Sequence, residues 1–218
     1  MKRYGMVIDL RKCIDCKGCI AICSMTWNSP INRELDDPVL MRKEIMAWLD
    51  GDVQQMNSRL AESIREDGNM LSVFEPCMHC DEPACVEACP VDAITKNEDG
   101  IVLVDYDKCE GDGSCVDACP YGKPYIREFS SPSAPAQRAD KCTFCVEFIN
   151  KGELPACVRT CQGHALYFGD LLDTQSEVSR LLNKEKHRAY VLAGKDGKFV
   201  KIADRPKTMT KPNVYYLA

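Results

Sequence analysis

The chain has 218 residues, a net charge of −5 and 28% charged residues. It carries no basic block of the kind that binds phosphate, so we expect no nucleic-acid partner. No apolar stretch of the sequence approaches the roughly 18–20 residues needed to cross a bilayer. The N-terminal residues show neither an apolar signal core nor twin arginines, so we expect a cytoplasmic protein, or a periplasmic one if a partner's signal carries it across the membrane.

Cysteine is the most informative residue type, because 15 cysteines are far more than a chain of this length normally contains. Disulfides are rare in reducing compartments, where dense cysteine indicates metal binding. The odd total also argues against a framework made only of disulfides. The composition therefore predicts a metalloprotein.

The first predicted element is a strand over residues 4–10, which leads into the first cysteines. Residues 28–72 have apolar positions at helical spacing, so we expect a helical insertion that either docks a partner or packs on the protein's own core. The turn-forming sequence Asn97–Gly100 precedes a strand over residues 101–104. A hairpin is therefore predicted between two groups of cysteines.

The C-terminal part of the sequence contains no cysteine after Cys161. Its apolar pattern predicts a helix over residues 171–182. A hairpin follows, with strands over residues 189–193 and 199–203 that turn at Asp196-Gly197. The last residues, 211–218, are expected to form a polar tail.

The cysteines fall into four groups with short, regular spacings. The spacings are C-x2-C-x2-C-x3-C in group one, C-x2-C-x4-C-x3-C in group two and C-x2-C-x11-C-x3-C in group four, while group three has three cysteines. In sequence order the groups are Cys13, Cys16, Cys19 and Cys23; Cys77, Cys80, Cys85 and Cys89; Cys109, Cys115 and Cys119; and Cys142, Cys145, Cys157 and Cys161. Asp112 stands where a fourth cysteine would complete group three.

These spacings suit 4Fe–4S clusters, which need one thiolate for each iron. Three cysteines at i, i+3 and i+6 let one short loop reach three corners of a cube, while loop amides stay free to donate to sulfur. A fourth cysteine three residues later turns away with the backbone, and in two-cluster ferredoxins it binds the other cluster. Pro90 and Pro120, directly after Cys89 and Cys119, fit that pattern.

The lengths between groups predict how the groups pair. Only 19 residues separate Cys89 from Cys109, enough for one hairpin, whereas 53 residues separate Cys23 from Cys77. Groups two and three therefore form one compact unit, and groups one and four are left to pair around it. We expect an α+β fold of two interleaved ferredoxin-like units, one inserted in the other. The predicted divisions are an outer unit of residues 1–27 plus 138–170, the helical insertion 28–72, an inner unit 73–137 and a C-terminal extension 171–218.

Zinc is the main alternative metal. A zinc site takes four ligands, typically from two C-x2-C pairs, and rarely has a fifth thiolate beside it. Group four alone comes closest to that pattern. Three- and four-cysteine runs repeated four times favour iron–sulfur clusters.

Asp112 is the departure from the cysteine pattern. A carboxylate is a harder and weaker ligand for cluster iron than a thiolate. The fourth cluster is therefore either 4Fe–4S with an Asp112 ligand or 3Fe–4S, and the alternative role of Asp112 is that of a solvent-facing turn residue.

Taken together, the four motifs resemble those of the four-cluster iron–sulfur (beta) subunits of the dimethyl sulfoxide reductase-type molybdopterin oxidoreductases. The similarity extends to the sequence Tyr4–Asp9 before the first motif and to Lys211–Tyr216 near the C-terminus. The resemblance implies three all-cysteine 4Fe–4S clusters and a fourth that includes Asp112. The implied ligand sets are Cys13, Cys16, Cys19 and Cys161; Cys142, Cys145, Cys157 and Cys23; Cys77, Cys80, Cys85 and Cys119; and Cys109, Asp112, Cys115 and Cys89.

The resemblance also implies a function in anaerobic respiration. The protein would relay single electrons to or from a catalytic subunit that carries a molybdenum or tungsten pterin, with a membrane anchor or a soluble electron donor at the other end. It would not be an enzyme by itself, and the sequence shows no convincing nucleophile–base pair or nucleotide-binding glycine loop. The alternatives are the iron–sulfur subunit of a hydrogenase, formate or carbon monoxide dehydrogenase complex, and a free-standing polyferredoxin.

Several charged residues lie among the motifs. We expect His79 to support the second motif or to lie at the surface, since four cysteines already saturate that site. Lys12, Lys17, Lys108 and Lys141 either offset the negative charge of the clusters or are solvated lysines.

Overall fold

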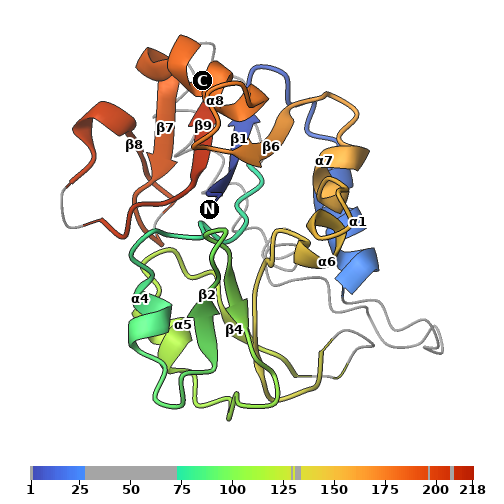
Figure 1. The fold of residues 1–218 in the computed structure, drawn as a ribbon, viewed down its shortest axis with the longest axis vertical. Helices are drawn as coiled ribbons and strands as arrows, with labels where there is room; N and C mark the ends of the chain where they lie inside the picture. The colour runs from blue at the N-terminus through green and yellow to red at the C-terminus, as the bar shows by residue number, and fades with distance from the viewer. Residues whose placement is uncertain (1, 28–72, 129, 131–133, 196, 207–208) are drawn as a thin grey trace.

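The computed structural model describes residues 2–27, 73–128, 130, 134–195, 197–206 and 209–218. The helical insertion predicted for residues 28–72 lies outside them. The described part is a mixed α and β protein, with a five-stranded sheet at one end and two short hairpins at the other (Figure 1). Within these ranges no helix has the length and apolar character needed to cross a membrane.

The five-stranded sheet has the order β6-β1-β9-β7-β8. Strand β1 (Tyr4–Asp9) pairs antiparallel with β6 (Leu166–Asp170) and parallel with β9 (Val214–Leu217). Strand β7 (Ala189–Leu192) pairs antiparallel with β9 and with the edge strand β8 (Phe199–Lys201). The sheet thus joins the beginning, the middle and the end of the sequence.

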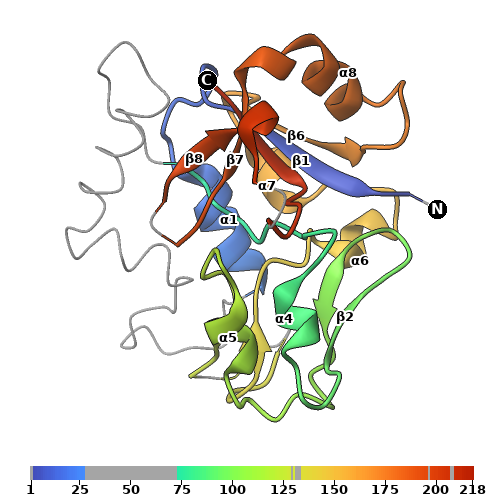
Figure 2. The ribbon, with the colours of Figure 1, turned by 90° about the vertical axis from the view of Figure 1, so that its left-hand side faces the viewer.

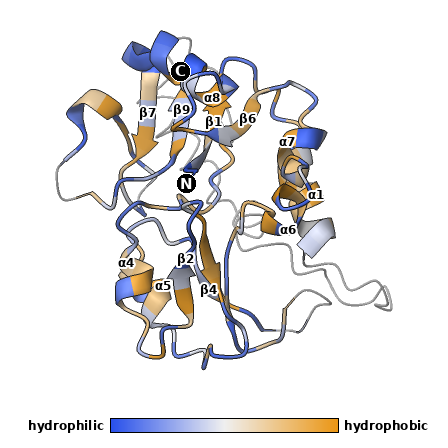
Figure 3. Cartoon of the chain, in the orientation of Figure 1, coloured by the Kyte–Doolittle hydropathy of each residue, from blue (hydrophilic) through white to orange (hydrophobic). Residues whose placement is uncertain are grey.

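Successive side chains of a strand point to opposite faces of the sheet, and both faces of this sheet are buried. Met6 and Tyr216 face a core shared with the cysteine loops. Val7 and Tyr215 face the opposite side, where they pack with Val178 of helix α8 (Glu177–Lys184). Hydropathy colouring shows orange on β7 and β9 and more blue on the covering helix α8 (Figure 3).

Gly5 lets the sheet pack closely at its junction with the C-terminal segment. A Cβ atom at this position would lie 2.5 Å from Cδ1 of Leu171 and 2.8 Å from the carbonyl oxygen of Asn213. Contacts this short are not tolerated, so a larger side chain would push β1 away from both neighbours.

Helix α1 (Gly18–Trp27) lies beside α7 (Ala156–Thr160) (Figures 1 and 2). Trp27 at the end of α1 also contacts Phe148 of α6 (Val146–Ile149). The first and last cysteine-bearing segments are therefore neighbours, although 118 residues separate Cys23 from Cys142 in the sequence. This contact and the β1–β6 pairing bring cysteine groups one and four to the same side of the molecule.

Cysteine groups two and three occupy the other end of the molecule, where the backbone forms short elements. In order these are α4 (Ala84–Glu87), β2 (Ile94–Lys96), β3 (Val102–Val104), α5 (Ser114–Ala118), β4 (Tyr125–Ile126) and β5 (Ala139–Asp140). β2 pairs antiparallel with β3, and β4 pairs antiparallel with β5. The hairpin predicted between groups two and three is present.

The C-terminal hairpin is also present, but the predicted helix begins later than expected. α8 begins at Glu177, and the side-chain oxygen of Ser176 accepts a hydrogen bond from the Ser179 amide at 3.2 Å. Asp173 forms a turn before it, since its side chain accepts from the Gln175 amide at 2.8 Å. Local side-chain hydrogen bonds thus replace the helix at residues 171–176. Two 3-10 turns, at Lys186–Arg188 and Ile202–Asp204, flank the hairpin.

The expectation of a polar tail was wrong. Residues 214–217 form β9, an interior strand of the sheet, and all four are buried. Only four residues long, the segment Val214–Leu217 offers too short a pattern to distinguish a strand buried on both faces from an apolar terminus.

The buried position of β9 gives a prediction for stability. Tyr216 is fully buried and its hydroxyl donates to the carbonyl oxygen of Phe74 at 3.3 Å. Tyr216→Ala should cost about 3–5 kcal/mol, as expected for truncating a buried aromatic side chain. Anaerobic thermal unfolding should show a melting temperature lower by roughly 10 °C. Tyr190→Ala, at a half-buried position on β7, is the control and should cost less. Equal losses in the two variants would contradict the central position of β9.

Candidate iron–sulfur cluster sites

The first predicted ligand set lines one cavity. Cys13, Cys16 and Cys19 reach it from the loop before α1 and its first turn, and Cys161 reaches it from the end of α7. The remaining wall is mostly apolar and includes Ile8 and Leu166 of the sheet. Sequence-distant cysteines thus meet because β1 pairs with β6 and α1 packs on α7.

The third predicted set lines a second cavity in the same way. Cys77 and Cys80 come from the loop before α4, Cys85 from α4 itself and Cys119 from the C-terminal end of α5. The packing of α4 on α5 brings these segments together. The residue that completes the set therefore comes from the neighbouring cysteine group.

The members of the other two sets also lie near one another. In each set, the neighbouring members contribute to the raised pKa of one central cysteine. Burial raises the pKa of Cys115 to about 11, with further contributions from Cys109, Asp112 and Cys89. Burial raises the pKa of Cys157 well above its usual value, with further contributions from Cys142, Cys23 and Cys145. Each central thiol is close enough to the other members of its predicted set to feel their charge.

Similar shifts occur in the two cavities. Burial raises the pKa of Cys19 to about 12, and Cys13, Cys161 and Cys16 add to the shift. Burial raises the pKa of Cys85 to about 12 as well, with Cys77 as the largest contributor among the neighbouring thiols. A thiolate is unfavourable in such surroundings unless positive charge compensates it, and bound iron supplies that charge.

Hydrogen-bond donors surround several cysteine sulfur atoms. Four of these donors are backbone amides and two are side-chain groups. They are the amides of Ala93 to Cys89 at 3.2 Å, Ala139 to Cys109 at 3.3 Å, Phe144 to Cys142 at 3.4 Å and Ala165 to Cys161 at 3.2 Å, the Trp27 indole to Cys145 at 3.4 Å, and the Thr210 hydroxyl to Cys80 at 3.1 Å. Donors of this kind stabilise cluster-bound thiolates.

Each predicted set supplies four donor side chains, the number that one 4Fe–4S cluster needs. Within the described ranges, no three His, Cys, Asp or Glu side chains are placed to share one ion. Four thiolates around one zinc at about 2.3 Å lie almost in contact with one another, whereas cluster thiolates bind different irons and stay further apart. The residues therefore fit 4Fe–4S clusters, and the ligation of iron by each residue stays a prediction.

Lys141 is the one motif lysine that is fully buried. Its side-chain ammonium donates to the carbonyl oxygens of Val102 and Cys142. It lies near Cys85, where its charge lowers the pKa of the thiol against the effect of burial. Lys12 and Lys108, by contrast, are exposed. A buried cation between the second and fourth cysteine groups offsets the negative charge of thiolates there.

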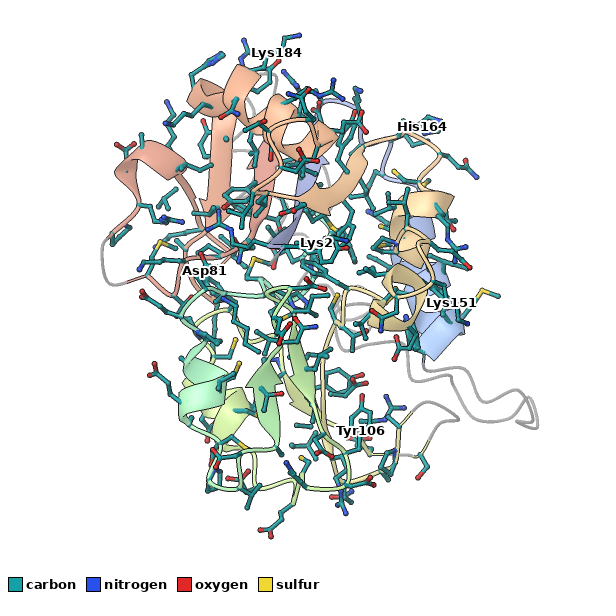
Figure 4. The ribbon with its side chains drawn as sticks, viewed as in Figure 1. Lys2, Asp81, Tyr106, Lys151, His164 and Lys184 are labelled. Atoms are coloured by element: carbon teal, nitrogen blue, oxygen red, sulfur yellow. The ribbon has the colours of Figure 1, made fainter. Side chains whose placement is uncertain are left out.

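His79 is buried, not at the surface. Its Nδ1 accepts a hydrogen bond from the Val102 amide at 3.0 Å, and its ring stacks on Phe144 with centroids 3.7 Å apart. Burial lowers its pKa well below the usual value, and the charge of Lys141 lowers it further. The neutral imidazole thus joins the second cysteine loop to the fourth. His164, which follows Cys161, is exposed on its loop (Figure 4).

Asp112 lies on an exposed loop between two glycines with positive φ, Gly111 and Gly113. Its carboxylate accepts a hydrogen bond from the Ser114 hydroxyl. It is also close enough to Cys115 to raise the pKa of that thiol. The ligand role of Asp112 therefore stays a prediction.

The residues that attach the C-terminal segment to the second cysteine loop were not among the predicted site residues. The Asn213 side-chain amide donates to the carbonyl oxygen of His79 at 2.8 Å and to the Asp81 carboxylate at 2.9 Å. Asp81 lies where the sheet meets the inner hairpins (Figure 4), and it also pairs with Arg3 and Lys96. No local pattern announces these contacts, because the partners lie more than 70 residues away from Arg3 and Asn213.

Comparison with known proteins agrees with this picture. The family model of the 4Fe–4S dicluster domain matches residues 69–171. The chain is similar to the B component of tetrathionate reductase from Salmonella typhimurium, with 36% identity over 99% of this chain and 72% of that protein. The B component of polysulfide reductase from Wolinella succinogenes is 33% identical over 83% of each sequence. The formate dehydrogenase iron–sulfur subunit of Haemophilus influenzae is 35% identical over 86% of this chain and 58% of that protein.

The fold and the cysteine sites therefore define a protein of the 4Fe–4S ferredoxin class. More narrowly, it belongs to the iron–sulfur (beta) subunits of the dimethyl sulfoxide reductase-type molybdopterin oxidoreductase family. Members of that family are electron-transfer subunits of oxidoreductase complexes, and catalysis on the substrate takes place in another subunit.

The distribution of cysteine in the cores gives a prediction about cluster removal. The core of the inner hairpins has seven buried residues, of which three are Cys85, Cys109 and Cys115. Among the described residues, the core between the sheet and α8 contains no cysteine. Anaerobic chelation should therefore abolish amide-exchange protection in β2 and β3 first, while β7 and β9 keep theirs. Hydrogen exchange with mass spectrometry measures this, and simultaneous loss of protection in both regions would contradict it.

Proposed function

We propose that this chain holds four iron–sulfur clusters in the sets that its motifs define and relays single electrons through them. The observation that carries the proposal is the gathering of each predicted set around a cavity or a central thiol. When bound, the clusters supply the one-electron chemistry. The protein supplies thiolates, amide donors, burial and nearby charge, which set the potentials.

The ligand sets proposed are those of the family pattern. They are Cys13, Cys16, Cys19 and Cys161; Cys142, Cys145, Cys157 and Cys23; Cys77, Cys80, Cys85 and Cys119; and Cys109, Asp112, Cys115 and Cys89. The first three sets would bind 4Fe–4S clusters through cysteine alone. The last would bind 4Fe–4S with Asp112 at one corner, or 3Fe–4S.

Contacts between sets support one order for the relay. Cys19 of the first set contributes to the raised pKa of Cys157 in the second. The His79–Phe144 stack links the loop of Cys142 to the loop of Cys80. Cys115 of the last set contributes to the raised pKa of Cys85. Electrons would therefore pass along the sets in the order given above, or in reverse.

The same contacts support two interleaved ferredoxin-like units. An outer unit of residues 1–27 plus 138–170 would hold the first two sets, and an inner unit of residues 73–137 would hold the other two. The pairing of β1 with β6 and the β2–β3 hairpin fit this division. Residues 171–218 would form the C-terminal extension that completes the sheet.

The partner proposed is a catalytic subunit with a molybdenum or tungsten pterin, because relatives are named as subunits of tetrathionate, selenate and polysulfide reductases. A membrane anchor or a soluble donor would exchange electrons at the other end. A formate dehydrogenase complex is the second candidate, favoured by the similarity to iron–sulfur subunits of such enzymes. Identification of the protein that co-purifies with this one from its native host distinguishes the two.

Metal analysis tests the four-cluster proposal. Fifteen thiolates and Asp112 make sixteen ligands, so an anaerobically prepared, fully loaded protein should contain about 15–16 irons and as many sulfides. Co-expression with the native partner and anaerobic reconstitution provide two independent preparations. A reproducible value near eight irons in both would overturn the proposal.

Asp112 should mark the labile corner. Oxygen donates less charge to iron than sulfur does and binds it less tightly, so mild oxidation should convert this cluster to 3Fe–4S. Asp112→Cys should make the cluster resist conversion. Electron paramagnetic resonance of the oxidised proteins measures the 3Fe signal, with Asp117→Cys on the exposed face of α5 as the control for an added thiol. Equal 3Fe signals in wild type and Asp112→Cys would show that Asp112 is only a turn residue.

A further inference from the structure

A chain of two hydroxyl groups ends on the sulfur atom of Cys80. The Thr210 hydroxyl oxygen lies 3.1 Å from Cys80 Sγ and donates to it. The same oxygen lies 2.9 Å from the Tyr121 hydroxyl. Cys80 and Tyr121 are buried, and both line the second cavity together with Thr210. The three groups come from three distant parts of the sequence.

The direction of these hydrogen bonds follows from the chemistry of a bound thiolate. A thiolate has no proton, so it only accepts, and Thr210 must use its single proton to donate to sulfur. The Thr210 oxygen then has lone pairs left for the proton of Tyr121. The order of donation is therefore from Tyr121 to Thr210 and from Thr210 to Cys80. In surroundings with little water, the first bond polarises and strengthens the second.

The backbone holds Thr210 firmly in this position. The Glu82 amide donates to the carbonyl oxygen of Thr210 at 3.1 Å, and the Asp81 amide donates to that of Lys211 at 2.9 Å. These two bonds fasten the C-terminal segment to the loop that follows Cys80. Two residues beyond Lys211, the Asn213 side chain adds its bonds to His79 and Asp81. These bonds hold the backbone of Thr210 where its hydroxyl reaches the sulfur of Cys80.

A side-chain donor differs from the backbone donors at other cysteines in one respect. Cys89, Cys109 and Cys161 each accept a hydrogen bond from a backbone amide. A substitution of the donor residue keeps that amide unless the new residue is proline. The donor to Cys80 is set by the identity of Thr210. A hydrogen bond to a cluster ligand stabilises the reduced, more negative state and so raises the reduction potential.

We propose that Thr210, supported by Tyr121, is a positioning residue that raises the reduction potential of the cluster held by Cys77, Cys80, Cys85 and Cys119. The inference rests on the proposed function, because it requires that this set binds a cluster. The C-terminal extension thereby tunes one step of the relay as well as completing the sheet. Removal of the threonine hydroxyl makes that one cluster harder to reduce and leaves the other three unchanged.

The test compares Thr210→Val, which keeps the shape but loses the donor, with Thr210→Ser, which keeps the hydroxyl. Each protein is loaded anaerobically, analysed for iron and titrated with a redox mediator series while electron paramagnetic resonance is recorded. We expect the potential of a single cluster to fall in Thr210→Val and to return toward the wild-type value in Thr210→Ser. Tyr121→Phe should give a smaller fall in the same cluster. Thr95→Val, at an exposed position on β2, is the matched control and should change nothing.

The outcomes separate this inference from the proposed function. Full iron content with an unchanged potential in Thr210→Val overturns the role of Thr210, and so does an equal shift of all four clusters. If Thr210→Val does not load, Tyr121→Phe decides, and an unchanged potential in that variant overturns the inference. A wild-type protein that lacks any cluster at Cys77, Cys80, Cys85 and Cys119 overturns the proposed function instead.

Discussion

The whole molecule is organised around the cost of burying negatively charged sulfur. Cysteines such as Cys19, Cys85 and Cys157 are enclosed by protein and by one another, and both effects raise the pKa of the thiol. A thiolate survives there only if positive charge and hydrogen-bond donors compensate it. Bound iron would provide most of that charge, the buried Lys141 adds a cation, and the loop amides add hydrogen-bond donors. The short helices and tight loops exist to deliver these donors.

This constraint divides the stability of the protein between two kinds of core. Near the inner hairpins, cysteines and alanines make up most of the buried core of the described part, so less apolar area is buried without the clusters. Behind the sheet, Val7, Val178 and Leu217 pack as in an ordinary α/β layer. The sheet therefore offers a frame that holds the two ends of the cysteine array in register. β1 and β6 lead directly into and out of cysteine groups one and four.

Local patterns in the sequence predicted one strand and one hairpin that lie close to the cysteines, but not the short helices that carry several of them. The spacing of groups two and three indicated a hairpin, and β2 and β3 form it; the strand before Cys13 is β1. The start of α8 was missed because Ser176 and Asp173 compete for the backbone with their side chains. Strand β9 was missed because its partners, β1 and β7, are far away in the sequence. Burial on both faces of a short strand leaves no alternation to detect.

The cluster sites likewise combine contacts that are local in the sequence with contacts between distant segments. Cysteine spacing identifies sulfur atoms that one loop presents together, since those positions are fixed by a few backbone angles. Some donors are local amides, such as that of Ala93 to Cys89. Others come from distant segments: Thr210 reaches Cys80 from the C-terminal segment, and Trp27 reaches Cys145 from α1. Proteins with the same cysteine spacing can therefore differ in these distant contacts, and so in the potentials of their clusters. On the proposed function, the C-terminal segment would thus tune one cluster of the relay through Thr210, from outside the cysteine motifs.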